Sequence, residues 1–266
     1  MTEAGGWGWR GIKGLTVAVY VFMFAPICVT LILSFNASQF GGFPMTGFSL
    51  HWFGVLMDND NVLRAFRMSA MLGVLTAFIC TVLGILAAMA LVRYDFPGKE
   101  FVNTLLVAPV LIPEVVLAIG LLLFIRWLQQ PRTFLLLLLG HVMLSLPYVV
   151  LVVQARLIGI KRVYEEAALS LGANRWQTFR EITMPLLMPA VFAGVLLAFT
   201  ISFDNVTATM FWRPPGVETM QTQIFSMLHT SISPEINALG TLMIAITVGL
   251  PVIGGGLARY LARGQR

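Results

Sequence analysis

Two carboxylates, Glu114 and Asp204, lie within or beside long apolar runs, where an ionisable side chain is energetically costly. Charged residues at such positions usually face a cavity, a partner or the interior of a helix bundle. In a narrow, low-dielectric passage a carboxylate attracts a cation more strongly than in bulk water. Asp204 is the favoured candidate, because Asn205 and Thr207 beside it form a stretch too polar to face lipid. We therefore predict that Asp204, Glu114 and Asn205 line a path for a cationic or amine-bearing solute.

Each carboxylate also has a structural alternative. Pro113 and Glu114 are typical of a helix that restarts after a proline break, where a carboxylate stabilises the free N–H groups of the first turn. Asp204 is placed to cap the outer end of the preceding apolar run or to pair with Arg213. The sequence alone leaves both interpretations open.

No pattern typical of catalysis or metal binding accompanies these carboxylates. The sequence contains no G-x-x-x-x-G-K-[ST] nucleotide-binding motif and no recognisable pair of nucleophile and base. The histidines His51, His141 and His229 are scattered without metal-ligand spacing, and His141 is best interpreted as a hydrogen-bonded histidine within an apolar helix. We predict no catalytic residue, no bound metal and no enzyme activity.

The elements that must position the carboxylates are membrane helices. Of the 266 residues, 58% are hydrophobic and 11% are charged, a composition typical of a polytopic helical membrane protein. We predict an all-α membrane protein with a single transmembrane domain, residues 1–266. The net charge of +5 does not indicate nucleic-acid binding, because no basic cluster is interleaved with aromatic residues. Six spans are predicted: Leu15–Leu33, Ala65–Val92, Phe101–Leu128, Phe134–Leu157, Leu186–Ser202 and Asn237–Tyr260.

Two local patterns add detail to this arrangement. Gly194 and Ala198 form a small-xxx-small pair that would let the fifth span pack closely on a neighbour. Trp52 and Phe53, which follow the first span, are typical of an anchor at the membrane interface.

Lys and Arg are distributed unevenly between the two sides of the predicted spans. With the N-terminus inside, twelve of the 17 basic residues fall in inner segments, and such an excess marks the cytoplasmic side. Both termini are therefore predicted to be cytoplasmic. The inner residues are Arg10, Lys13, Arg93, Lys99, Arg156, Lys161, Arg162, Arg175, Arg180, Arg259, Arg263 and Arg266, and the outer ones are Arg64, Arg67, Arg126, Arg132 and Arg213.

The segment Glu165–Pro189 is unusually polar for the second half of the chain and is predicted to lie outside the membrane. Good helix formers occupy 166–171, Gly172 follows as a helix end or turn, and Pro185 closes the segment before the next apolar run. From the residues alone, an amphipathic loop lying on lipid headgroups is an alternative.

The spacing within this segment resembles the EAA loop of ABC-importer permeases. Glu166-Ala167-Ala168, three residues, Gly172, nine residues, then Ile182 and Pro185 reproduce the pattern, with Met184 standing where the family usually has Leu. The resemblance implies that residues 160–185, here called the coupling loop, form a short cytoplasmic helix that docks on an ATP-hydrolysing subunit. The residues expected at that contact are Glu166, Ala167, Ala168, Gly172, Ile182 and Pro185.

Three further stretches are similar to spermidine/putrescine-type permeases: Pro113–Val115, Ser202–Asn205 and Ser233–Ala238. Asn205 departs from these relatives, which often carry a second acidic residue there. The resemblance covers nearly the whole chain and implies a type I importer permease in the inner membrane, forming half of the path for a polyamine-like solute.

The same resemblance implies several partners and no cofactor bound by this chain. It implies an ATPase dimer that binds ATP and Mg, a second permease subunit that is a different chain, and an extracytoplasmic solute-binding protein. The alternative function is a stand-alone secondary carrier or channel for a small polar solute. The pattern from Glu166 to Pro185 argues against it, because a stand-alone carrier has no use for an ATPase contact.

The predicted orientation can be tested by cysteine labelling of intact cells. Ser38→Cys should react with a membrane-impermeant thiol reagent added outside, whereas Ser170→Cys should react only after the membrane is opened. The reverse labelling pattern would contradict cytoplasmic termini.

Overall fold

The computed structural model describes residues 5–39, 42, 44–230 and 234–263, so Ser233 of the third similar stretch and Arg266 of the inner basic set lie outside the described residues. Within these ranges the regular elements are helices, accompanied by an isolated antiparallel bridge between Asn36 and Phe48. The chain divides into two compact units. Unit 1 comprises Met1–Leu63 and Ile224–Ala245, and unit 2 comprises Arg64–Gln223 and Ile246–Arg266.

Unit 1 contains α1 (Gly5–Leu33), α2 (His51–Met57) and a loop between them that is fixed by a buried asparagine. The Asn36 side chain donates to the Gly42 carbonyl at 2.8 Å and accepts from the Thr46 N–H at 3.2 Å. The Trp52 indole N–H donates to the Asn36 carbonyl at 2.9 Å, and the Trp52 side chain is only 8% exposed. The prediction of an interfacial anchor at Trp52 is therefore wrong, because this ring packs within the loop.

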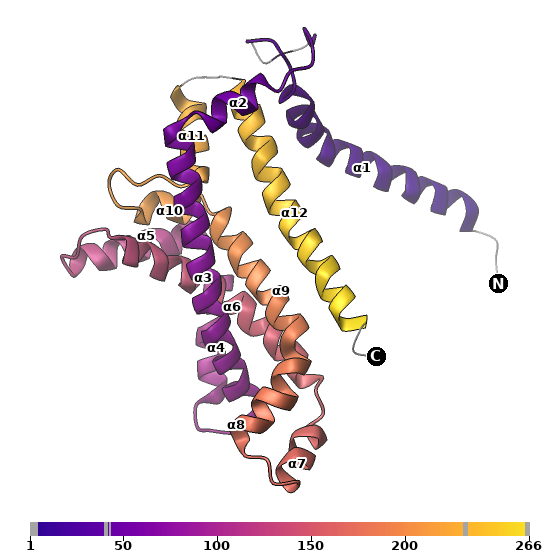
Figure 1. Cartoon of the computed structure of the whole chain (residues 1–266), viewed down its shortest axis with the longest axis vertical. Helices are drawn as coiled ribbons and strands as arrows, with labels where there is room; N and C mark the ends of the chain where they lie inside the picture. Colours follow the sequence, from indigo (N-terminus) through magenta and orange to yellow (C-terminus); the bar gives the residue numbers. More distant parts are fainter. Residues whose placement is uncertain (1–4, 40–41, 43, 231–233, 264–266) are drawn as a thin grey trace. The chain divides into compact units, whose positions relative to one another are not determined.

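Unit 2 is built around α6 (Phe134–Ile158), which packs against α9 (Met184–Phe203) (Figure 1). In the apolar stretch of α6, 67% of the residues are buried, compared with 33% in the apolar stretch of α3 (Asp60–Arg93). Small residues permit the close approach of these helices. A Cβ atom at Gly84 of α3 would lie 2.7 Å from Val149 of α6, and one at Gly194 of α9 would lie 3.1 Å from the same side chain. The predicted close packing at Gly194 is confirmed.

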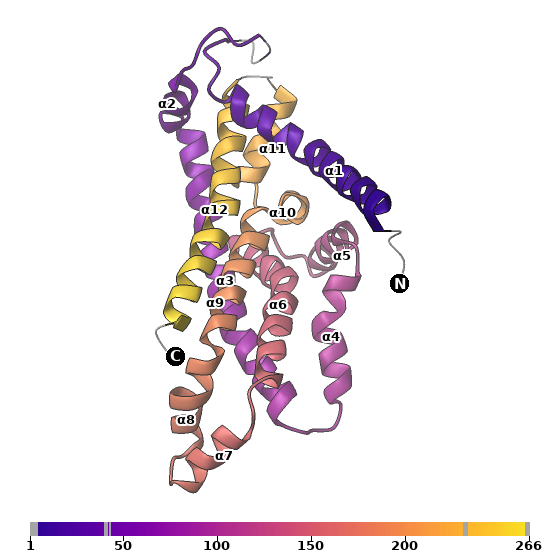
Figure 2. The same cartoon turned by 90° about the vertical axis from the view of Figure 1, so that its right-hand side faces the viewer.

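The third predicted span is not one continuous helix. It consists of α4 (Lys99–Leu111) and α5 (Glu114–Trp127), which meet at 108°, and Figure 2 shows α5 lying across the end of α4. The break has a local cause. Pro113 disfavours the helical conformation for the residue before it, and Ile112 accordingly is extended, with φ −95° and ψ 132°. The predicted restart of a helix at Glu114 is confirmed.

The helix α5 is held by α10 (Thr207–Trp212), a short helix that follows α9. The Trp212 indole N–H donates to the Ala118 carbonyl at 2.9 Å, and the Trp212 side chain is fully buried. A Cβ atom at Gly140 of α6 would overlap the Trp212 ring, so this glycine provides the space that the ring occupies. The bent α5 is thereby tied to the centre of unit 2.

The other five predicted spans each coincide with a long apolar helix. The candidate spans are Gly11–Leu33, Asp60–Arg93, Phe134–Ile158, Arg175–Phe203 and Glu235–Gly256, and the bent α4–α5 pair adds a sixth if it is counted as one span. The last of the five lies in α12 (Glu235–Arg263), and α11 (Met220–Thr230) precedes it. An all-α membrane fold is thus confirmed, whereas the cytoplasmic location of the termini stays a prediction.

Candidate functional site

The coupling loop forms three short helical elements at the end of unit 2 opposite α10 (Figure 1). They are α7 (Val163–Ser170), α8 (Arg175–Thr178) and η1, a π-helical turn (Phe179–Thr183) that runs directly into α9. Asn174 begins α8 with a capping box, because its side chain accepts from the Gln177 N–H at 2.9 Å and its own N–H donates to the Gln177 side chain at 2.8 Å. The predicted helical loop is confirmed as a local structure.

Gly172 ends α7 in the conformation that glycine adopts most easily. Its φ is +91°, its N–H donates to the Leu169 carbonyl at 3.1 Å, and the Ala173 N–H donates to the Ala168 carbonyl at 3.1 Å. This pair of bonds is the Schellman motif, which satisfies the last carbonyls of a helix and turns the chain. Open space surrounds the position where a Cβ would lie, so backbone conformation rather than crowding favours glycine here.

Glu165, which the sequence pattern did not single out, anchors the coupling loop to α3. Its carboxylate lies 2.9 Å from Nε of Arg93 and accepts a hydrogen bond from the Thr183 hydroxyl at 2.8 Å. Arg93 also donates to the Ile160 carbonyl at 3.1 Å. The side chains of Arg93 and Glu165 are only 9% and 16% exposed, so solvent screens this ion pair less than a surface pair.

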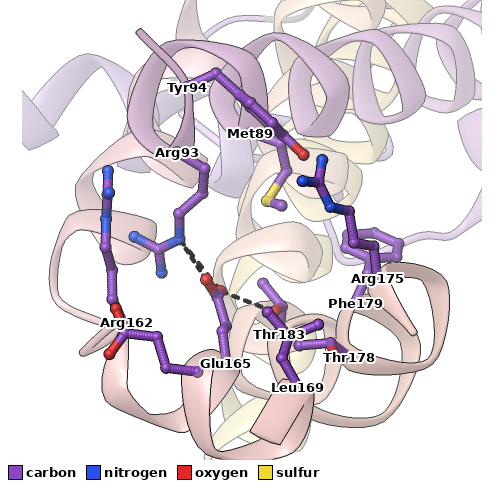
Figure 3. A pocket seen from close by; sticks show the side chains of 11 residues that line it. Met89, Arg93, Tyr94, Arg162, Glu165, Leu169, Arg175, Thr178, Phe179 and Thr183 are labelled. Carbon is purple, nitrogen blue, oxygen red and sulfur yellow. Dashed lines mark hydrogen bonds and ion pairs between the residues drawn. The ribbon is translucent and has the colours of Figure 1, made fainter. Parts of the chain in front are cut away.

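A cavity of about 220 Å³ opens beside this ion pair, and Figure 3 shows Arg162 and Arg175 on opposite sides of it. Tyr94 also lines the cavity and begins the turn that leads to α4. In that turn Lys99 donates to the Asp95 carboxylate at 2.9 Å, and this hydrogen bond lowers the pKa of Asp95 below its ordinary value.

The family-pattern residues of the coupling loop lie mostly on its surface. Glu166, Ala167, Gly172 and Pro185 are exposed, whereas Ala168 and Ile182 are half-buried. Five large apolar side chains are exposed among these polar residues: Leu171 at 89%, Trp176 at 67%, Val163, Tyr164 and Leu169. The loop thus presents an apolar surface beside its arginines and glutamates.

At the bend between α4 and α5, one oxygen of Glu114 holds the start of α10. Oε1 accepts from the Asn205 side-chain amide at 2.6 Å and from the Ala208 N–H at 3.2 Å. Glu114 also occupies the first turn of α5, so its charge stabilises the N-terminal ends of two helices. The structure thus brings Glu114 and Asn205 together.

These two residues lie at a cavity of about 390 Å³. Its walls are apolar except for Glu114, Asn205 and Tyr148 of α6, which sequence reasoning missed. The apolar lining comes from α4 and the bend, with contributions from α6 and α9: Pro109, Val110, Leu111, Ile112, Pro113, Leu144 and Ile201. A carboxylate and an aromatic ring in an apolar cavity can bind a primary ammonium group.

Asp204 has partners of its own and takes no part in the two hydrogen bonds of Glu114. It occupies the position after α9, and its Oδ1 accepts from the Gln221 side chain at 2.7 Å and from the Thr247 hydroxyl at 3.3 Å. Its predicted position at the end of the helix is confirmed. The alternative of an ion pair with Arg213 is wrong, because Arg213 pairs with Glu218.

Residues 80–266 match the family described as "Binding-protein-dependent transport system inner membrane component". The chain is 38% identical over 252 residues to the spermidine/putrescine transport system permease protein PotC of Escherichia coli K12, covering 95% of each chain. It is 35% identical to the putrescine permease protein PotI of the same strain, covering 93% of this chain and 89% of PotI.

A more distant relative and a solved structure extend this comparison. The putative 2-aminoethylphosphonate transport system permease protein PhnV of Salmonella choleraesuis is 30% identical, covering 96% of this chain and 97% of PhnV. A chain in the crystal structure of a bacterial ABC transporter involved in the import of the acidic polysaccharide alginate aligns over 96% of both chains, with a TM-score of 0.75 and 17% identity. At that identity the likeness shows a shared fold only.

Among the described residues, the apolar helices are long enough to cross a membrane, and a helical loop joins two of them. The chain belongs to the family of inner-membrane components of binding-protein-dependent transport systems. It is a multi-pass permease subunit of an ABC importer in the inner membrane and not an enzyme.

The anchoring role of Glu165 can be separated from any role of its neighbour Glu166. Glu165→Gln leaves the Arg93 guanidinium without its counter-charge, which should destabilise the folded protein by about 1–3 kcal/mol. Glu166→Gln changes an exposed side chain and should alter stability by no more than about 0.5 kcal/mol. Thermal unfolding of the two purified variants in the same detergent compares them, and equal losses would contradict an anchor at Glu165.

Proposed function

We propose that the solute of this importer carries a primary amine and is polyamine-like. The relatives are named for spermidine, putrescine and 2-aminoethylphosphonate, and each of these compounds has a primary amine. The observation that carries the proposal is that the Glu114 carboxylate lines one cavity together with Tyr148, Asn205 and several apolar residues. An alkylammonium ion needs a carboxylate for its charge and an apolar wall for its methylene groups.

In this proposal Glu114, Asn205 and Asp204 line the path of the solute. Glu114 acts at the cavity. Asp204, which lies between the end of α9 and Asn205, contributes a second negative charge. The hydrogen bonds of Asp204 with Gln221 and Thr247 involve only Oδ1, which supports a free Oδ2 for a solute cation.

The coupling loop is proposed to dock on a separate ATPase, which binds ATP and Mg. Glu166, Ala167, Ala168, Gly172, Ile182 and Pro185 belong to this contact. The exposed Leu171 and Trp176 support the proposal, because apolar side chains on an otherwise polar loop gain by being covered. With this loop in the cytoplasm, both termini lie there as well.

The complete importer would contain further subunits. A second permease chain completes the path, and an extracytoplasmic binding protein delivers the solute. One solved structure of similar fold is an alginate transporter in complex with its periplasmic protein, which supports such a partner by analogy. Units 1 and 2 are proposed to act as one permease domain. The dependence on an ATPase distinguishes this function from a stand-alone carrier.

Substitution of Gly172 tests the coupling proposal through backbone conformation. Gly172→Val should reduce transport strongly, because a β-branched residue is strained by roughly 1–2 kcal/mol at positive φ and the turn would shift. Gly172→Asn should retain much more transport, since asparagine tolerates this conformation. Both variants should insert normally, and uptake measured at equal expression compares them. Full transport by Gly172→Val would count against the contact.

Neutral variants of the two carboxylates test the solute class. Glu114→Gln and Asp204→Asn should each lower uptake of putrescine or spermidine at low concentration by roughly tenfold, because the neutral side chain offers a solute cation only a dipole in place of a full negative charge. Glu100→Gln, an exposed change in the first turn of α4, is the matched control. If both neutral variants transport like the unaltered importer, neither charge guides a cation.

A further inference from the structure

A continuous chain of hydrogen bonds runs through the interior of unit 2 and ends at Glu114. The Thr76 and Ser202 hydroxyls lie 3.3 Å apart, and Ser202 Oγ lies 2.8 Å from Nδ1 of His141. Nε2 of His141 lies 3.0 Å from Thr209 Oγ1. The residues of this chain, called the polar chain below, are Thr76, Ser202, His141, Thr209, Asn205 and Glu114.

Thr209 joins the histidine to Asn205. Its hydroxyl donates to the Asn205 carbonyl at 2.7 Å, and its N–H donates to the Asn205 side-chain oxygen at 3.1 Å. With its oxygen held in this way, the Asn205 amide presents its NH₂ group to Glu114 Oε1 at 2.6 Å. The orientation of the amide is therefore set from the Thr209 side.

The hydroxyls on either side of His141 each donate away from the ring. Ser202 donates to Thr76 at 3.3 Å, and Thr209 donates to the Asn205 carbonyl at 2.7 Å. Both hydroxyl oxygens also lie within hydrogen-bond distance of a ring nitrogen of His141, and the donor and acceptor roles there follow the tautomer of the ring. Hydrogen bonds that share members in this way polarise one another and strengthen the chain.

Burial makes the inner links of this chain difficult to exchange for bonds with water, whereas Asn205 is half-buried and Glu114 is exposed. Thr76 and Thr209 are fully buried, and His141 is 1% exposed. A buried imidazole can be a satisfied core side chain and nothing more. This one, however, joins α6 to α9 and α10, and its last link reaches the carboxylate at the cavity.

Within the described part of the chain, the two hydrogen bonds that Glu114 accepts, from Asn205 and from the Ala208 N–H, both go to Oε1. A fixed Oε1 also fixes the direction of Oε2. A preoriented acceptor binds a cation with less loss of side-chain entropy than a mobile one.

We propose that His141 and Thr209 are positioning residues that hold Asn205, and through it the Glu114 carboxylate, in the orientation that receives an ammonium group. This inference rests on the proposed role of Glu114 in the solute path and deepens it. Loss of the polar chain weakens the binding of the amine, and it leaves the charge of Glu114 in place. The effect therefore falls on KM rather than on the maximal rate.

The first test measures putrescine uptake by cells that carry the complete importer. Thr209→Val keeps the shape of the side chain and removes its hydroxyl, so KM should rise about fivefold to tenfold at an unchanged maximal rate per assembled transporter. Thr81→Val is the matched control. The Thr81 hydroxyl also donates to the carbonyl four residues before it, that of Ala77 at 2.7 Å, but Thr81 lies on α3 and is not part of the polar chain. Its KM should not change.

Two histidine variants give a readout that depends on which ring nitrogen is replaced, and they also serve if Thr209→Val does not assemble. His141→Gln places an amide near the position of Nε2 and should recover most of the affinity through the bond to Thr209. His141→Asn places an amide near Nδ1, keeps the bond to Ser202 only, and should raise KM as Thr209→Val does. Equal KM values for the two variants would contradict the inference.

A double variant separates this inference from the proposed function. If Thr209 acts through the carboxylate, Thr209→Val should add little to the KM of Glu114→Gln. A full further rise in the double variant, or a lower maximal rate with KM unchanged in Thr209→Val, means a structural role only and overturns the inference. An unchanged KM for Glu114→Gln alone, or no putrescine uptake by the unaltered importer, overturns the proposed solute site instead and the inference with it.

Discussion

The inability of Pro113 to continue a helix is the constraint on which the candidate solute site depends. Proline lacks an N–H and forces Ile112 into an extended conformation, so α4 ends and α5 leaves at 108°. The helix α5 then begins beside α10, and the Glu114 carboxylate stabilises the free N–H groups at the start of both helices. The cavity, the carboxylate and the neighbouring asparagine all lie at this bend. A continuous third span would have carried Glu114 into the bundle without these partners.

The same unit carries the coupling loop, and one helical path joins the two regions. From Arg175 to Phe203 the backbone stays helical through α8, η1 and α9, and the residues after α9 lead to Asn205. At the start of this path, Glu165 fixes the loop to Arg93 of α3. Helices transmit displacement because their backbone bonds resist bending, whereas flexible loops absorb it. The architecture therefore gives a stiff mechanical connection between the proposed ATPase contact and the proposed solute path.

The sequence predicted the features that depend on local composition. Apolar length located the five unbroken spans, and the spacing after Glu166 located the turn at Gly172, whose positive φ only a few residue types tolerate. It did not predict the 108° bend, because a proline in a membrane helix can produce either a kink or a break, and the neighbouring helices decide which. Glu165, Tyr148 and the burial of Trp52 were missed for a related reason. Their partners are Arg93, the cavity wall and Asn36, and nothing in the local pattern of each residue identifies a partner distant in the sequence.

The π-helical turn η1 sets the direction in which the coupling loop faces. A π turn amounts to one extra residue in an α-helix, and each α-helical residue corresponds to a rotation of about 100°. If the same residues Phe179–Thr183 were α-helical, everything before them would be rotated by about that angle relative to α9. Thr183 would then no longer meet Glu165, and Trp176 would point to a different side of the molecule. The wider winding of this turn therefore determines which face of the loop is presented to a partner.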